Sequence, residues 1–217
     1  MRSENKVSRQ ILSCIKKCFR KVCIMFRWII LAGITGIVLG LLGGIFINCI
    51  NEVTALREAN PWMIYMMPAA GLLIVAVYKF DKYGTGTNCV LEGIHSGTYV
   101  PLRMAPLIII STIITHTVGG SAGREGAALQ LGGSIGGSLG LIMKLDEYDK
   151  KIMIMCGMSG AFSALFGTPL TATVFSMEII SVGIMQYAAL VPCAIAALVA
   201  EKVAASIGAV SASLSLP

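Results

Sequence analysis

The sequence has few charged residues for its length, and this scarcity excludes a water-soluble globular protein. Asp, Glu, Lys and Arg make up 13% of its 217 residues, whereas hydrophobic residues make up 56%. A soluble domain carries roughly 25% charged residues and about 45–50% apolar ones. The apolar residues also fall in long runs without a charge, as in helices that cross a bilayer. We therefore expect an all-α, polytopic membrane protein.

The sequence also lacks the cysteine and histidine spacing that a disulfide framework or a metal site requires. Its seven cysteines show no CxxC spacing and have no histidine at ligand spacing. Most of them lie in apolar segments, where cysteine acts as a small hydrophobe. We therefore predict no disulfides, no metal and no other cofactor.

Positive charge is concentrated at the N-terminus. Eight of the 17 Lys and Arg residues lie within residues 1–27, so the net charge of +6 is local and predicts no nucleic-acid partner. No cleavage site follows, which excludes a signal peptide. Apolar residues recur between the cations at helical spacing, which predicts an amphipathic helix on the cytoplasmic leaflet. The alternative is a disordered basic tail; in either case the N-terminus is expected in the cytoplasm.

Uncharged runs between residues 28 and 208 predict the membrane-spanning part of the chain. Pro169 interrupts one of these runs and predicts two short helices there instead of one rod. Short or interrupted helices are typical of transporter folds with broken and re-entrant helices, which meet within the membrane. The uncharged runs cover residues 28–50, 62–78, 104–120, 152–177 and 179–200.

Two sets of glycines recur at every fourth position, and each predicts a smooth stripe that another helix can approach closely. We interpret both stripes as packing surfaces without a further role. The two sets are Gly36, Gly40 and Gly44, and Gly132, Gly136 and Gly140.

Glu125 is the ionisable residue with the strongest functional signal. A carboxylate inside an apolar region is costly, so a functional role is the first hypothesis. A structural ion pair with Arg124 is the alternative, but adjacent residues on a helix do not face each other. Glu125 also lies at a glycine break before a stretch compatible with a helix, where free N–H groups attract anions. It can therefore act as a tethered anion that competes with a diffusible one until it is protonated.

Residues 84–88 (GTGTN) form a second candidate for anion binding. Glycines permit unwound backbone there, and the hydroxyl and amide groups donate hydrogen bonds without adding charge. Taken alone, this stretch is more typical of an ordinary polar turn.

Residues 120–132 (GSAGREGAALQLG) resemble the GxxGREGPxVQxG signature of the CLC chloride channels and proton-coupled anion antiporters. Residues 160–170, followed by residues 174–178, resemble the next signature of that family. The resemblance runs from about Arg27 to about Gly208 and covers only the first of the two inverted repeats. It implies the CLC fold and a homodimer through residues 169–208.

The resemblance also implies roles for individual residues. Glu125 would be the gate, and backbone amides near it would bind the anion. Thr87 would take the place of the central serine of the GSGIP loop, with Thr85 as the alternative. The residues implied in anion binding are Thr87, Asn88, Gly123, Arg124, Gly126 and Ala127.

The sequence departs from the usual signatures in three places. Ala127 replaces the proline after GREG, and GTNCV replaces GSGIP; both changes resemble the fluoride-exporting branch. Ile179 follows Glu178 at the position of the inner carboxylate of proton antiporters, so the usual internal proton route is not implied. Glu178 itself is interpreted as a structural or water-ordering residue.

From these patterns we expect transport of a small inorganic anion, with chloride favoured, and no enzymatic activity. The alternatives are a fluoride/proton antiporter and a non-transporting fragment. We expect a multi-pass protein of the cell membrane whose partners are chloride or fluoride, protons, the lipid bilayer and a second copy. Residues 1–27 are expected to form the basic segment and residues 28–208 the transmembrane region. Residues 209–217 are expected to be a tail, with the chain truncated before a second repeat.

An intramembrane serine protease is a remote alternative. Residues 157–160 match the GxSG of rhomboid proteases, with Ser159 as the nucleophile. In rhomboids the catalytic histidine follows the serine, but His95 and His116 both precede Ser159. A general base must reach the nucleophile, so this interpretation is disfavoured.

Overall fold

The computed structural model describes residues 2–79, 87–96, 100–179 and 185–209, with the side chains of 2–21, 95 and 96 left aside. Within these ranges every regular element is a helix and none is a strand. In chain order the helices are α1 (Arg2–Ala59), η1 (Pro61–Met66), α2 (Met67–Lys79), α3 (Thr87–Ser96), α4 (Met104–Thr117), α5 (Arg124–Ile142), α6 (Glu147–Phe166), α7 (Pro169–Glu178), η2 (Tyr187–Ala189) and α8 (Leu190–Ser206).

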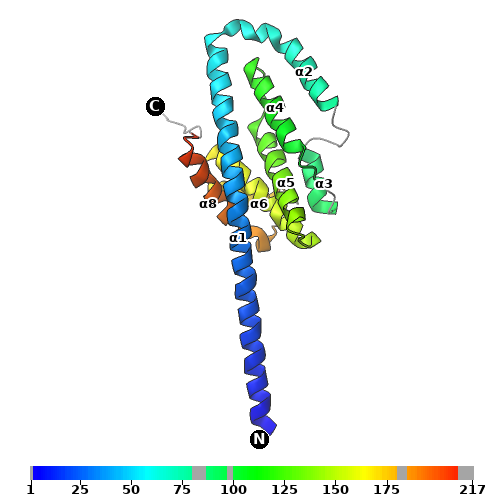
Figure 1. Ribbon diagram of the computed structural model, residues 1–217, viewed down its shortest axis with the longest axis vertical. Helices are drawn as coiled ribbons and strands as arrows, with labels where there is room; N and C mark the ends of the chain where they lie inside the picture. Colours follow the sequence, from blue (N-terminus) through cyan, green and yellow to red (C-terminus); the bar gives the residue numbers. More distant parts are fainter. Residues whose placement is uncertain (1, 80–86, 97–99, 180–184, 210–217) are drawn as a thin grey trace.

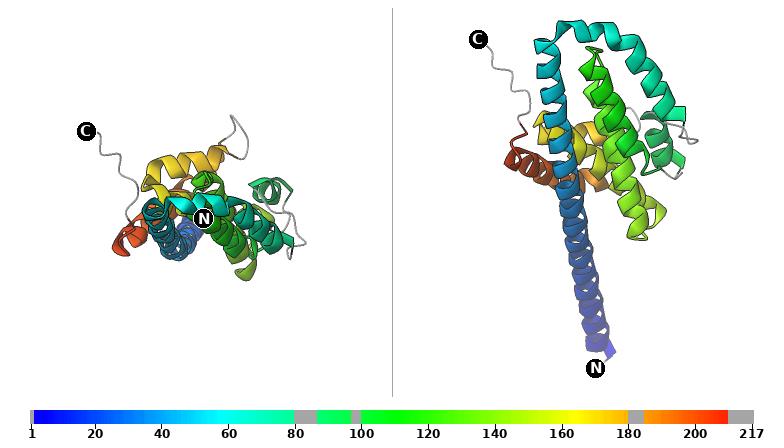
Figure 2. Two further views of the ribbon diagram at one scale, coloured as in Figure 1. Left: turned by 90° about the horizontal axis from the view of Figure 1, so that it is seen from above. Right: turned by 45° about the horizontal axis from the view of Figure 1, so that its top comes forward.

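Helix α1 is a rod of 58 residues that projects well beyond the rest of the bundle (Figures 1 and 2). At 1.5 Å per residue it is about 87 Å long, far longer than the roughly 30 Å of a bilayer's hydrocarbon core. It ends before Pro61, since the residue preceding a proline disfavours the helical conformation. Residues 2–27 are helical and continue in line with the apolar part. Their position on the leaflet stays a prediction.

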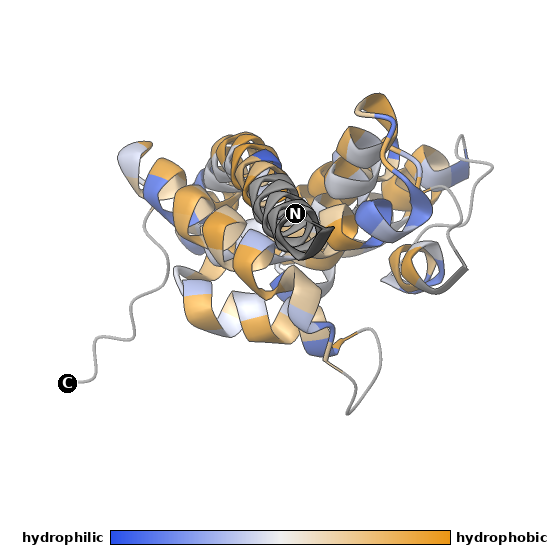
Figure 3. Cartoon of the chain, turned by 90° about the horizontal axis from the view of Figure 1, so that it is seen from below, coloured by the Kyte–Doolittle hydropathy of each residue, from blue (hydrophilic) through white to orange (hydrophobic). Residues whose placement is uncertain are grey.

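Three helical segments of the described chain are long and apolar enough to cross a membrane: Val22–Ala59, Pro61–Lys79 and Tyr187–Ser206. The last one corrects the expected run over residues 179–200. Residue 179 caps α7, and the final helix begins only near Tyr187. A run of uncharged residues indicates an apolar segment, but it does not indicate the residue at which a helix begins. Many large hydrophobic side chains of these helices are exposed, and hydrophobic residues recur along the helices in Figure 3, as expected for contact with a bilayer.

The expected break in the run over residues 152–177 is confirmed. Helix α6 ends at Phe166, and its C-cap Gly167 adopts the left-handed conformation with φ 66°. Pro169 then starts α7 at a position where a helix needs no N–H. A tilted ring contact between Phe162 of α6 and Phe175 of α7 packs the two helices together across this break, and Phe166 stacks against Phe162 within α6.

Both glycine stripes lie where helices cross. A Cβ atom on Gly36 would lie 2.7 Å from the carbonyl oxygen of Ala196, and one on Gly40 would lie 2.7 Å from that of Ala200. Helix α1 therefore rests directly on the backbone of α8. Helices α5 and α6 approach even more closely, because Gly132 and Gly157 face each other backbone to backbone. The packing role expected for these glycines is confirmed.

An ion pair joins the basic end of α1 to the start of α6, before the apolar run that begins at Ile152. Arg27 Nη2 lies 2.8 Å from Asp149 Oδ2. Burial raises the pKa of the Asp149 carboxyl above its ordinary value, Asp146 adds to the rise, and Arg27 opposes both. The folded state therefore holds the Asp149 proton more tightly than the unfolded chain does. The contribution of Asp149 to stability falls as the pH rises from the pKa of the unfolded chain through that of the folded state. At neutral pH the ionised Asp149 carboxylate therefore lowers the free energy of unfolding.

Asp149→Asn should consequently leave the melting temperature at pH 7 unchanged or slightly raised, despite the loss of a short ion pair. The expected change in unfolding free energy is below about 1 kcal/mol. Thermal unfolding in detergent, followed by tryptophan fluorescence, measures it, with Glu147→Gln on the same helix turn as the control. A drop of many degrees for Asp149→Asn alone would contradict this account.

Candidate functional site

The start of α5 has no side-chain cap. A tight turn leads into it from α4, and Gly119 adopts φ 84° in that turn, which favours glycine. The N-cap is Gly123, which has extended backbone and no side chain to cap the helix. The first N–H groups of a helix lack partners within it. Together with the helix dipole they attract negative charge.

Glu125 lies in the first turn of α5 and its side chain is exposed. A Cβ atom on Gly123 would lie 3.0 Å from Glu125 Oε2, so the carboxylate bends back over the start of its own helix. Among the ion pairs of the described residues none joins Glu125 to Arg124. The structure therefore places this carboxylate at the anion-attracting end of α5.

Thr87 begins α3 and lies beside the first two turns of α5. Gln130 Nε2 donates to Thr87 Oγ1 over 3.4 Å, and a Cβ atom on Gly126 would lie 3.6 Å from the same oxygen. Two helix starts therefore meet, although Thr87 and Glu125 are far apart in sequence. Asn88 is the next, exposed residue of α3. The alternative candidate, Thr85, lies outside the described residues.

Ala127 and Gly126 contribute backbone only. The Ala127 side chain is 2% exposed and packs with Phe46, Ile50 and Leu165, which hold the start of α5 against α1 and α6. The methyl group therefore points into the core, and the N–H is what Ala127 can offer an anion. A bulkier residue at this position would press against the same core.

Sequence reasoning gave no role to Gln130, which the structure places next to Thr87. Gln130 is a buried polar residue, 9% exposed, in a helix that is otherwise lined with small and apolar side chains. A buried amide needs a hydrogen-bond partner, and Thr87 supplies it. The signal in the sequence was a lone glutamine inside the uncharged stretch after Glu125.

Basic groups surround the turn between α4 and α5. The guanidinium of Arg57, near the end of α1, lies over Gly119: a Cβ atom there would be 3.3 Å from Arg57 Nη1. His116 lies in the last turn of α4, and its Nε2 is buried without a hydrogen-bond partner. Arg124 is half-buried at the start of α5. The guanidinium groups of Arg57 and Arg124 therefore place two positive charges at the turn that leads to Glu125.

Glu178 and Ser159 lie apart from this site. Glu178 is exposed at the end of α7, and Ile179 after it packs on the buried core. Ser159 is fully buried and donates to the carbonyl oxygen of Cys193 over 3.2 Å. Its hydroxyl therefore joins α6 to α8, which argues against a protease nucleophile. Groups of three or more residues suited to a metal ion do not occur in the described part of the chain.

Comparisons with known proteins agree with this architecture. The family model described as voltage gated chloride channel matches residues 70–217. A "Chloride/fluoride channel protein" from Pseudomonas syringae pv. tomato is 36% identical over 187 residues, which are 85% of this chain and 41% of the relative. The chain thus spans less than half the length of this relative.

Two solved structures are similar to the chain. The crystal structure of a CLC-type fluoride/proton antiporter has a TM-score of 0.81 and 33% sequence identity, over 89% of this chain and 50% of that one. A slow cyanobacterial Cl−/H+ antiporter has a TM-score of 0.68 and 19% identity, over 83% and 47% of the two chains, and supports the fold alone. The chain is therefore a multi-pass, all-α membrane protein that belongs to the voltage-gated chloride channel family.

Proposed function

We propose that this chain supplies the glutamate-gated part of an anion pathway in a CLC-type channel or transporter, with chloride as the anion carried. The observation that supports this most is the Glu125 carboxylate bent back over the uncapped start of α5. A carboxylate in that place imitates the anion that the helix start attracts. The proposed role needs no catalysis.

The proposed gate works by competition. When ionised, Glu125 occupies the start of α5 and keeps a diffusible anion out. When protonated, it loses its charge and its attraction to the N–H groups and the helix dipole. An anion can then bind at Gly123, Arg124, Gly126 and Ala127, mainly through backbone amides.

The Thr87 hydroxyl and the Asn88 amide at the start of α3 are proposed as further donors to the anion. The Thr87 oxygen already accepts from Gln130. Its own hydroxyl hydrogen therefore stays free to donate to an anion.

Fluoride with coupled protons is the second candidate for the transported ion. Ala127 and the GTNCV sequence depart from the usual chloride signatures. The Pseudomonas relative is named for both chloride and fluoride, and the more similar of the two solved structures is a fluoride/proton antiporter. Efflux from liposomes loaded with chloride or with fluoride, read by ion-selective electrodes, decides between them.

Two reconstitutions test the proposal. Residues 28–208, transplanted into the full-length Pseudomonas syringae relative, should support anion efflux, and the loss of all flux in a folded chimera would contradict the proposed pathway. The chain alone, reconstituted into liposomes, tests whether it transports without further helices. No flux from the chain alone would favour the third candidate, a non-transporting fragment that requires a partner.

We further propose a homodimer through residues 169–208, in the cell membrane, with the N-terminus in the cytoplasm. Helices α7 and α8 expose large apolar side chains that suit such an interface, and the basic residues before residue 28 favour the orientation. We propose residues 1–27 as the membrane-surface segment, 28–208 as the transport region and 209–217 as a tail. The exposed apolar residues are Leu170, Val174, Leu190, Val191 and Leu198.

Thr87→Val should change the preference between anions in the chimera. Valine has nearly the shape of threonine but cannot donate a hydrogen bond, and one such bond contributes about 1 kcal/mol, or about fivefold in binding. The measurement is the ratio of chloride to fluoride efflux. Thr87→Ser keeps the donor and serves as the control. Identical ratios for the valine variant and the unmodified protein would remove Thr87 from the pathway.

A further inference from the structure

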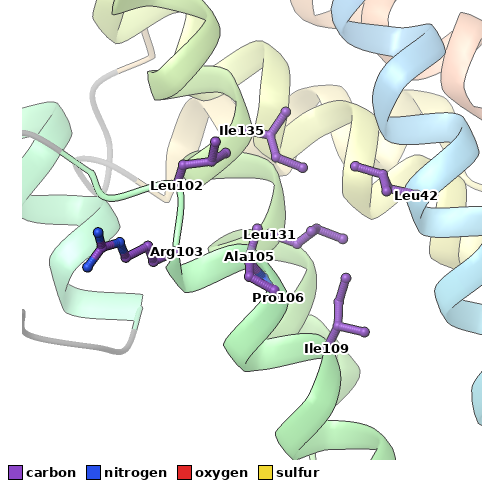
Figure 4. Close-up of a pocket in the computed structure, with 8 residues that line it drawn as sticks. All are labelled: Leu42, Leu102, Arg103, Ala105, Pro106, Ile109, Leu131 and Ile135. Atoms are coloured by element: carbon purple, nitrogen blue, oxygen red, sulfur yellow. The ribbon is translucent and has the colours of Figure 1, made fainter. Parts of the chain in front are cut away.

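A groove outside the Glu125 site is lined almost entirely by apolar side chains. It has a volume of about 460 Å³ and lies between α1, α4 and α5, with Leu42, Ile109, Leu131 and Ile135 around it (Figure 4). Leu102, Ala105 and Pro106 complete the lining. Water in such a space would lack polar partners, so an apolar occupant is favoured.

One cation stands at the edge of this groove. Arg103 lines it at the start of α4, and its guanidinium extends away from the apolar side chains (Figure 4). The Arg103 side chain is exposed and pairs with no carboxylate of the described residues. An unpaired guanidinium beside an apolar groove complements a ligand with an anionic head and a hydrocarbon tail.

We propose that this groove binds an anionic phospholipid, with one acyl chain along α4 and the phosphate on Arg103. Arginine is suited to phosphate because its planar donors bind two oxygens at once. Basic pockets between membrane helices are a known mode of binding anionic head groups. Helix α4 runs in the same direction as α1 (Figure 1). Arg103 precedes the first residue of α4 and therefore lies at the end of that helix nearer the basic N-terminal segment, where the anionic leaflet is expected.

The occupant can be identified by photo-crosslinking of the whole chain in nanodiscs. The probes are phosphatidylglycerol and phosphatidylcholine that carry the same diazirine on one acyl chain. Labelled peptides are mapped by mass spectrometry. Phosphatidylglycerol should label residues 102–109 and 131–135 about fivefold more than phosphatidylcholine does, the effect of one arginine near the head group.

Two pairs of variants distinguish the contribution of the lipid head group from that of the apolar groove. Arg103→Gln should reduce phosphatidylglycerol labelling to the level of phosphatidylcholine, whereas Arg103→Lys should keep part of the preference. Ile109→Trp fills the groove and should reduce labelling by both lipids. Ile110→Trp, on the adjacent position with 46% exposure and outside the lining, should leave it unchanged.

Several results would overturn the proposal. Equal labelling by the two lipids, or a preference that survives Arg103→Gln, would show that Arg103 holds no phosphate. Labelling that avoids the groove would show that protein covers it, either a second copy or a further segment. If Ile109→Trp does not yield monodisperse protein, the exposed Arg103 variants still decide the outcome.

Discussion

Replacing Glu125 by Gln should abolish the pH dependence of anion flux in the full-length chimera that carries residues 28–208. The ionised carboxylate is proposed to compete with the anion for the start of α5, so flux through the unmodified protein should rise as the pH falls, because protonation removes that competing charge. The glutamine variant is neutral at every pH and should vary by less than about twofold.

The measurement is anion efflux from liposomes over a range of external pH at constant ionic strength. Glu178→Gln is a matched control, because Glu178 is an exposed carboxylate at the end of α7 and lies apart from the start of α5. Its pH profile should equal that of the unmodified chimera. If flux through the Glu125→Gln variant still changed with pH, a titratable group other than Glu125 would control it.

The sequence predicted those features of the fold that depend on single residues. Pro169 marked the break between α6 and α7, and Gly167 supplies the left-handed cap that ends α6. The uncharged runs correctly indicated the apolar segments, but they placed the start of the last helix at residue 179, about eight residues before its start at Tyr187. Helix boundaries depend on caps and tertiary packing, and nothing local in residues 179–186 signals a helix start.

The candidate site could be predicted only as separate pieces. Glu125 stood out because an ionisable residue in apolar chain is rare. The contact between Thr87 and the first turns of α5 depends on how α3 packs on α5, and no local pattern encodes it. Gln130, which joins the two pieces by a hydrogen bond, was overlooked for the same reason.

Replacing Gly132 or Gly157 by Leu should have the largest effect on folding. The two glycines face each other where α5 crosses α6, and a Cβ atom on either would collide with the other's carbonyl group. Backbone cannot yield as a flexible side chain does, so the helices must separate along their buried length. Overpacking of a core costs about 1–3 kcal/mol when side chains can adjust, and we expect more than about 3 kcal/mol here.

The measurement is the yield of monodisperse protein in detergent and its melting temperature. Gly33→Leu and Gly71→Leu are the controls, since a Cβ atom at either position meets nothing within 4 Å. Both controls should express and unfold as the unmodified chain does. Helix α5 carries Glu125 at one end and this crossing along its middle, so separation of α5 from α6 would also displace the proposed gate. A Gly157→Leu protein that keeps its yield and melting temperature would show that the crossing is looser than the structure has it.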